Sequence, residues 1–590
     1  MTSERQPPGP AGDPWWKNTT VYHVYPRSFS DSNGDGIGDL PGVLARLDYL
    51  HDLGVETIWL SPFFRSPQGD FGYDITDHTA VDPSHGSMDD FHRLVDAIHE
   101  RGMKVVLDTV LNHTSIEHPW FIASRSSREH EKRDWYIWRD GARRDGKARP
   151  NNWRNLLGGR GWHFDAATGQ WYWASFLPFQ PDLNWRNPEV KDAMLGVVRH
   201  WLDRGVDGLR LDIFNALYKD ASFADNPLSL RPIPSEVNPE GFFQRPIHTL
   251  DHPDTIAFSR ELRSVVDAYG DPQRFVVGEV MGSFDRLREY CGAGAEGLHL
   301  VFMFETMRTH FSASGFRELI AETEAKFAAP LQPTWVFSNH DRPRAIHRLG
   351  DDPDKARLLA MLQLTVRGVP FIYYGEELGL SHVEIPPELG LDPIAARFAW
   401  IPHWLGRRLR GHGILLNRDE CRLPMPWSEG KNAGFTPEHV VPWLPLHPDS
   451  GSMNVDVQRG DPRSVHATYR RLLRLRREHP ALYGGSLELV EAEQHPRPVL
   501  AYRRVAADEV ATVLLNFSER PVEVDLPPRV DSLHSNTEPD PRHAGGRYTL
   551  GAYEGVVAIR AVASLSACVD TSSGSATPSA DDPPRSSSQR

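Results

Sequence analysis

Short apolar segments alternate with segments of helical spacing over most of the first 375 residues. The apolar segments have the length of buried strands, and several are followed directly by polar or charged residues. Apolar residues recur at helical spacing between them, over 40–53, 91–101, 188–204 and 255–269. We predict eight strands at 20–26, 56–62, 104–113, 206–213, 274–280, 298–304, 334–341 and 369–375. Strands that alternate with helices favour a parallel sheet, and eight of them favour an α/β fold of the (β/α)8 TIM-barrel type.

Two regions break this alternation. Residues 114–187 are rich in Trp, Arg, Gly and Asn, and a structureless loop of that length is uncommon, so we predict a small domain (domain B) inserted after the third strand. Residues 486–563 show short strands without helices between them, which predicts a C-terminal antiparallel β-sandwich domain. The barrel is then expected over 15–113 and 188–485. The composition of residues 1–14 and 564–590 predicts a disordered arm and tail.

Composition narrows the possible partners and compartments. The 590-residue chain carries a formal net charge of -14, which argues against nucleic acid and against an anionic membrane surface. No apolar run is long enough for a membrane helix, and the N-terminus lacks the apolar core of a secretory signal. The three cysteines are far apart, which favours a reducing compartment, and we expect a cytoplasmic location. We expect a monomer or a dimer.

Three carboxylates come directly after the apolar part of a predicted strand and would therefore open on one face of a barrel. They are Asp212, Glu279 and Asp341. Glycosyl transfer needs an ionised carboxylate as nucleophile and a protonated one as acid. Arg210, two residues before Asp212, would hold the charge of that nucleophile, whereas Glu279 has no adjacent cation and is the candidate acid. Each residue alone is explained equally well as a structural charge, but three at one face favour catalysis.

Two further polar clusters are candidates for binding. His113 lies at the exit of the third strand, where an imidazole can donate to a ligand hydroxyl, although a single histidine is more often a satisfied core group. The loop from Asp31 to Asp39 places oxygen-bearing side chains at two-residue spacing with glycines between them, which is typical of loops that bind a hard cation. Gly42 stands where an EF-hand would have its last Glu, so the loop is not an EF-hand. The alternative is an Asx/Gly turn that binds nothing.

Four motifs resemble those of the α-amylase superfamily of retaining glycoside hydrolases (family 13). They are the segments at 108–113, 208–212, 277–279 and 337–341. The resemblance covers the chain up to about residue 563. It implies that Asp212 attacks the anomeric carbon, that Glu279 acts as acid and then as base, and that Asp341 stabilises the transition state. It also implies that Arg210, His113 and His340 line the first sugar subsite.

Further segments resemble the α-glucosidase and oligo-1,6-glucosidase group of that superfamily. They are Gln180-Pro-Asp-Leu-Asn184, Tyr73-Asp-Ile and the stretch around Arg422. The resemblance implies that Asp74 pairs with Arg422 to close the pocket and hold the terminal glucose, and that Phe176 contacts this sugar. A closed pocket implies exo-action on α-glucosides. The group's structural Ca²⁺ or Mg²⁺ loop would be formed here by Asp31, Asn33, Asp35, Ile37 and Asp39, with no organic cofactor.

Alternatives remain open at this point. An α-glucosyl transferase or isomerase, such as a trehalose- or isomaltulose-forming enzyme, would have the same fold and the same carboxylates. A non-catalytic relative that keeps the barrel as a scaffold would lose those carboxylates, which this chain retains. Leu423 and Pro426 replace the group's usual Thr and Gln. Ile213 follows the nucleophile, and its β-branched shape leans toward α-1,6 linkages without fixing the linkage.

Overall fold

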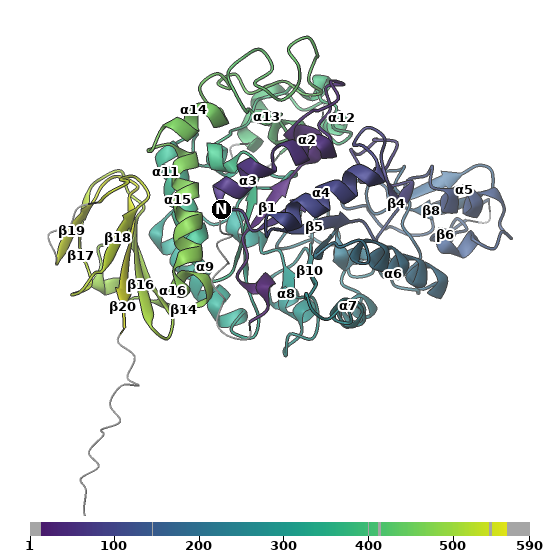
Figure 1. Cartoon of the computed structure of the whole chain (residues 1–590). Helices are drawn as coiled ribbons and strands as arrows, with labels where there is room; N and C mark the ends of the chain where they lie inside the picture. Colours follow the sequence, from purple (N-terminus) through teal and green to yellow (C-terminus); the bar gives the residue numbers. More distant parts are fainter. Residues whose placement is uncertain (1–12, 144, 399, 411–414, 542–545, 563–590) are drawn as a thin grey trace, which may run out of the picture.

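The computed structural model describes residues 13–143, 145–398, 400–410, 415–541 and 546–562 (Figure 1). The predicted tail at 564–590 and all but two residues of the predicted arm at 1–14 lie outside these ranges. Figure 1 shows a central body, a C-terminal set of strands on one side beside α15 (Val465–Glu478), and a small sheet around β8 (Gln170–Trp173) on the opposite side.

A sheet of eight parallel strands forms the centre of the molecule, in the order β11-β10-β9-β5-β2-β1-β13-β12. The two edge strands are linked through the hydroxyl of Thr334, which donates to Val301 O (2.8 Å) and accepts from Met303 N (3.1 Å). The TIM-barrel prediction is therefore confirmed, with each strand inside its predicted segment. The strands are β1 (Val21–Val24), β2 (Thr57–Leu60), β5 (Lys104–Thr109), β9 (Gly208–Leu211), β10 (Phe275–Gly278), β11 (Leu300–Val301), β12 (Thr334–Val336) and β13 (Val369–Tyr373).

Helices follow the strands and surround the sheet (Figure 1). The predicted helix over 40–53 is divided in two, because Arg46 leaves helical geometry at φ -107° and ψ 8°. The α-helices are α1 (Pro26–Phe29), α2 (Leu40–Ala45), α3 (Leu47–Leu53), α4 (Met88–Glu100), α5 (Pro119–Ser126), α6 (Pro188–Leu202), α7 (Pro253–Asp267), α8 (Phe284–Cys291), α9 (Ala313–Lys326), α10 (Ala345–Arg348), α11 (Pro353–Thr365), α12 (Ala395–Phe398), α13 (His403–Arg410), α14 (Val455–Gly460), α15 and α16 (Pro480–Gly484).

Alternation along β9 separates the helix-facing core from the barrel interior. Leu209 and Leu211 pack into the large cluster beneath the helices. Residues of opposite parity face the interior, where an apolar layer includes Phe275 and Val277 of β10. A Cβ at Gly208 would lie 2.7 Å from the Phe275 ring, so glycine leaves room for that ring at this level of the barrel. Arg210 stands one step further along the same interior column, toward the carboxyl end of the strand.

Four smaller sheets lie outside the barrel. The first consists of β6 (Trp138–Arg139), β8 and β7 (Trp162–Asp165), and Trp153, Trp162 and Trp173 pack together beside it. The C-terminal region is antiparallel, as predicted, with a five-stranded sheet in the order β14-β15-β16-β20-β18 and a two-stranded sheet of β17 and β19. These strands are β14 (Ser486–Leu489), β15 (Val499–Val505), β16 (Glu509–Asn516), β17 (Val522–Asp525), β18 (Ser532–Ser535), β19 (Arg547–Leu550) and β20 (Gly555–Ala561). A further pair joins β3 (Phe64–Arg65) and β4 (Asp77–Val81).

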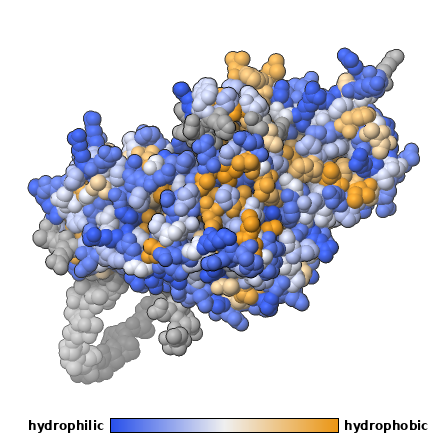
Figure 2. All heavy atoms as spheres, turned by 90° about the horizontal axis from the view of Figure 1, so that it is seen from above, coloured by the Kyte–Doolittle hydropathy of each residue, from blue (hydrophilic) through white to orange (hydrophobic). Residues whose placement is uncertain are grey.

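The surface is mostly hydrophilic, with hydrophobic residues gathered in several areas of the face shown in Figure 2. The exposed large hydrophobic side chains lie mainly in two connections, 228–247 and 389–404. Within the described ranges, none of the helices combines the length and the apolar character needed to traverse a bilayer.

Candidate active site

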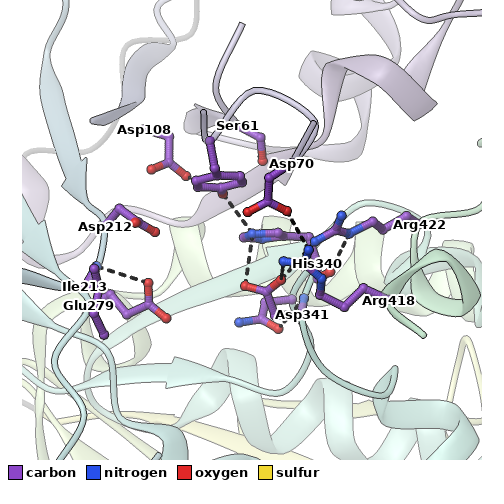
Figure 3. A network of polar contacts seen from close by, with 12 residues as sticks. Ser61, Asp70, Asp108, Asp212, Ile213, Glu279, His340, Asp341, Arg418 and Arg422 are labelled. Carbon is purple, nitrogen blue, oxygen red and sulfur yellow. Dashed lines mark hydrogen bonds and ion pairs between the residues drawn. The ribbon is translucent and has the colours of Figure 1, made fainter. Parts of the chain in front are cut away.

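The carboxyl ends of neighbouring strands bring the three predicted catalytic carboxylates to one face. Leu211 of β9 pairs with Gly278 of β10, so the residues that follow them, Asp212 and Glu279, leave the sheet at the same level. Asp341 follows β12 across the mouth of the barrel. In Figure 3, Asp212 and Glu279 lie together on one side of the site, and Asp341 and His340 lie on the other. Side chains at the carboxyl face of a TIM barrel occupy the position where such enzymes carry out their chemistry.

Arg210 connects the two carboxylates on its side of the site. Its Nη1 lies 2.7 Å from Asp212 Oδ1 and 2.7 Å from Asp108 Oδ1, and its Nη2 contacts Glu279 Oε2. The sequence-based expectation that Glu279 lacks an adjacent cation is therefore wrong. It failed because sequence separation hides the partner: Arg210 pairs across the sheet with Val277, two residues before Glu279. One fully buried guanidinium thus serves Asp212, Asp108 and Glu279 together.

Burial and mutual repulsion raise the pKa values of these three carboxylates toward neutrality. Burial raises the pKa of Glu279 to about 7 despite the attraction of Arg210, and Asp212 and Asp341 add to the rise. Burial likewise raises the pKa of Asp212 to about 7, with Asp108 and Asp341 contributing, while Arg210 opposes the rise. The pKa of Asp108 rises to about 6 for the same reason. Coupled carboxylates that titrate this close to neutrality suit a site in which one group stays ionised and another carries a proton.

Asp341 has the opposite electrostatic environment. Burial alone would raise its pKa, but His340, Arg418 and Arg422 outweigh burial and hold the pKa well below its usual range. His340 Nε2 lies 3.1 Å from Asp341 Oδ2, and Arg422 Nη2 lies 2.9 Å from Oδ1. Asp341 is also 31% exposed, more than either of the other two carboxylates. It is therefore a fixed anion that faces the open part of the site.

Tyr73 joins the two sides. Its hydroxyl donates to Asp108 Oδ2 (3.0 Å) and lies 2.8 Å from His340 Nε2, and its ring stacks on His340 with 5.3 Å between centroids. His113 Nε2 bonds to the backbone oxygen of Tyr73 (3.1 Å), and its ring lies 5.4 Å from that of Phe176. The predicted binding residues Tyr73, His113, His340 and Phe176 are thus brought together.

The pairing expected between Asp74 and Arg422 is not the one that forms. The Asp74 carboxylate turns into its own loop and accepts from Ser66 Oγ (2.8 Å), Gly69 N (2.9 Å) and Asp70 N (3.0 Å). Arg422 instead binds Asp341 and donates through Nε to His340 O (2.8 Å). Because loop amides already satisfy Asp74, it has no need of a distant cation.

Asp70 and Arg418 form the ion pair in that place. Arg418 Nη2 lies 2.5 Å from Asp70 Oδ1, and its Nη1 lies 3.2 Å from Asp341 Oδ1. Asp392 anchors the same guanidinium at 2.8 Å, and Gln180 Nε2 donates to Asp70 Oδ2 (3.0 Å). Figure 3 shows Asp70 directed toward the two arginines. Sequence reasoning predicted Gln180 as a binding residue but not the Asp70–Arg418 pair, although Asp70 is three positions before Tyr73 and Arg418 is four before Arg422. A motif does not show which of two acids meets which arginine.

The residue after Asp212 adopts an unusual backbone conformation. Ile213 has φ 36° and ψ 51°, a left-handed geometry that costs a β-branched residue roughly 1–3 kcal/mol. Its side chain is buried among Ala216 and Leu250, with Phe176 packed against them. The left-handed conformation of Ile213 turns the chain sharply at the end of β9. After this turn Phe214 N donates a hydrogen bond to Glu279 O (2.8 Å).

The predicted cation loop is closed by its own hydrogen bonds. Asp31 accepts from Gly34 N (2.7 Å) and Gly36 N (2.8 Å), and the side chains of Asn33 and Asp35 accept from the amides two residues on. Asp39 caps α2 by accepting from Gly42 N. Among the described residues, His, Cys, Asp and Glu side chains form no group of three or more able to hold a metal ion. Calcium loops also use amide and main-chain oxygens, so the structural Ca²⁺ or Mg²⁺ at this loop stays a prediction.

The chain resembles proteins of known name over most of its length. It is 40% identical over 529 residues to a probable alpha-glucosidase of Rhizobium meliloti, covering 87% of this chain and 91% of that protein. It is 36% identical over 540 residues to an oligo-1,6-glucosidase of Halalkalibacterium halodurans, covering 88% and 92%.

Solved structures give a similar result. The alpha-glucosyl transfer enzyme XgtA matches with a TM-score of 0.82 and 39% identity, covering 93% of this chain and 99% of that one. The trehalulose synthase MutB from Pseudomonas mesoacidophila matches with a TM-score of 0.80 and 32% identity, covering 93% and 100%. The family model of the alpha-amylase catalytic domain matches residues 23–485 of this chain. The chain therefore belongs to the α-amylase family of glycoside hydrolases.

Proposed function

We propose that the protein is an exo-acting α-glucosidase that removes terminal non-reducing α-linked glucose from di- and oligosaccharides with retention of configuration. The observation that carries the proposal is the shared guanidinium of Arg210, which brings Asp212 and Glu279 together with pKa values near 7. The names of the α-glucosidase and oligo-1,6-glucosidase relatives support the same activity.

In this mechanism ionised Asp212 attacks the anomeric carbon while Glu279 gives its proton to the departing glycosidic oxygen. A covalent glucosyl–Asp212 ester results, and the leaving sugar departs with its new hydroxyl. Glu279, now ionised, then takes a proton from water as the water oxygen attacks the same carbon, which frees α-glucose and restores both carboxyls. Asp341, already held anionic by His340 and two arginines, favours the positively charged transition state.

Exo-action follows from the polar network at one end of the site. Asp70, Gln180 and Arg418 bond to one another, and Asp392 anchors the arginine from behind. A sugar chain cannot continue through such a network, so we propose that only a terminal glucose fits there. The two cysteines that the structure describes, Cys291 and Cys421, are free and buried, which supports the proposal of a reducing, cytoplasmic setting.

A panel of maltose, isomaltose, sucrose, trehalose and starch, with products resolved by chromatography, tests the proposal. We expect glucose from one or more of the disaccharides and no internal cleavage of starch. Internal cleavage of starch, or no turnover of any α-glucoside, would refute exo-glucosidase action.

Glucosyl transfer is the second candidate, because XgtA is named an alpha-glucosyl transfer enzyme and MutB a trehalulose synthase. Transfer differs from hydrolysis only in the acceptor that attacks the glucosyl ester. The two are separated by raising the sugar concentration in the same panel. Isomerised disaccharides or trisaccharides that exceed free glucose would identify a transferase.

A further inference from the structure

Glu236 is a largely buried carboxylate outside every motif of the sequence. It lies in the long connection between β9 and α7, and its side chain is 11% exposed. A charged group at this depth is costly unless it is paired. The two cations that approach it belong to other loops.

The contacts of Glu236 reach the segments that follow four consecutive barrel strands. Its carboxylate contacts the guanidinium of Arg342 through Oε1, and Oε2 lies 3.7 Å from Arg308 Nη1. Its backbone oxygen accepts from Gly282 N at 2.7 Å. Glu236 itself belongs to the segment after β9, Gly282 follows β10, Arg308 follows β11 and Arg342 follows β12.

Three of these four segments, those after β9, β10 and β12, carry the catalytic carboxylates. Arg342 is the residue after Asp341, and Gly282 comes three residues after Glu279. The connection that holds Glu236 begins at Asp212. Glu236 therefore joins the connection that begins at Asp212 to the segments that follow Glu279 and Asp341. An exposed ion pair contributes little to stability, but a buried carboxylate that joins separate loops restricts their relative movement.

We propose that Glu236 is a positioning residue, which acts through Arg342 and Gly282 to hold the segments that carry Asp341 and Glu279 in place relative to each other. This role rests on the proposed glucosidase function, since it is the attack geometry that Glu236 would maintain. Misplacement of reacting groups by about 1 Å can cost on the order of a hundredfold in rate. Loss of the cross-link should therefore appear in kcat, while the terminal glucose is still held by the Asp70–Arg418 network.

Glu236→Gln tests the proposal with little change of shape, and Glu240→Gln is the matched control. Glu240 lies in the same connection and accepts a hydrogen bond from Ser229 Oγ of that connection. We expect Glu236→Gln to lower kcat at least about tenfold, with KM within about twofold of the wild type. Glu240→Gln should leave both unchanged, and the two variants should unfold at similar temperatures.

A double-mutant cycle with Arg342→Gln isolates the ion pair. If Glu236 acts through Arg342, the double variant should be no slower than the slower single variant, because the same link is removed only once. Additive losses in kcat, an unchanged kcat in Glu236→Gln, or an effect on KM alone would overturn the proposal. If Glu236→Gln does not fold, Arg342→Gln alone, measured well below its unfolding temperature, decides by the same kcat criterion. Absence of turnover in the wild type would instead refute the proposed function.

Discussion

Arg210 contacts Asp212 through one terminal nitrogen of its guanidinium and Glu279 through the other. The nucleophile and the acid are therefore not distinguished by which of them has a cation, as both share one. The two roles differ in protonation. Three carboxylates, Asp108, Asp212 and Glu279, share the single positive charge of Arg210, so one of them keeps a proton near neutral pH. The coupled titration of these groups leads to the first prediction.

The pH dependence of kcat/KM should be bell-shaped with an optimum near neutral pH. Below the optimum both Asp212 and Glu279 are protonated, so attack fails, and activity rises as the first proton leaves. Above it both are ionised and no proton is available for the leaving oxygen, so activity falls. The pKa values of about 7 for each group place the two limbs on either side of neutrality. A profile of kcat/KM from pH 4 to 10 on an unactivated disaccharide measures both limbs, and a rate that keeps rising to pH 9 would contradict the assignment.

The two catalytic roles can be separated by azide. Asp212→Asn should lower turnover by at least about a thousandfold, because the covalent step is lost. Glu279→Gln should retain formation of the glucosyl ester from an aryl α-glucoside with a good leaving group, which needs no acid. Azide should then accelerate that variant and give α-glucosyl azide, because azide attacks the ester without a general base. In Asp212→Asn azide should give the β-anomer by direct displacement. Nuclear magnetic resonance of the products distinguishes the two, and β-azide from Glu279→Gln would reverse the roles.

Substitution of Asp70 should weaken binding of the terminal glucose. Asp70→Asn removes the negative charge that pairs with Arg418 at 2.5 Å, so we expect KM for a disaccharide to rise about tenfold or more. Asp74→Asn is the comparison, since the Asp74 carboxylate accepts from Ser66 Oγ and from the amides of Gly69 and Asp70 in its own loop. That variant should lose thermal stability rather than affinity. A larger KM effect for Asp74→Asn than for Asp70→Asn would restore the pairing expected from the sequence.

Arg422→Ala should also raise KM, but through Asp341. Arg422 donates to Asp341 Oδ1 and to His340 O, so its loss frees the segment that carries the transition-state carboxylate. We therefore expect kcat to fall together with the rise in KM, whereas Asp70→Asn should act mainly on KM. Steady-state kinetics on one disaccharide compares the two variants, and an unchanged KM and kcat for Arg422→Ala would argue against this role.

The sequence was sufficient for what depends on local pattern and insufficient for what depends on partners across the fold. Apolar runs of strand length located all eight barrel strands, and the residues after them located Asp212, Glu279 and Asp341. The neighbours of Glu279 and Asp74 could not be predicted in the same way. Arg210 reaches Glu279 because two strands pair in a particular register, and Asp74 loses Arg422 because amides of its own turn satisfy it first. Glu236 gave no signal, because each of its partners is remote in sequence.

Occupancy of the Asp31–Asp39 loop can be tested through thermal stability. The loop amides already satisfy much of the hydrogen-bonding capacity of Asp31 and Asp35, so the loop keeps a defined turn without a cation. If a cation nevertheless binds the remaining lone pairs, it stabilises the folded state by an amount that grows with the logarithm of its concentration over its dissociation constant. A chelator should then lower the unfolding temperature, Ca²⁺ or Mg²⁺ should restore it, and activity in the cold should change little, because the Asp31 side chain bonds within its own loop and to Thr436. Asp35→Asn, which keeps an oxygen for the turn but removes one charge, should abolish the cation response while it preserves most of the stability in chelator. Unfolding temperatures that are identical with chelator and with added cation would show that the loop is an Asx turn that binds nothing.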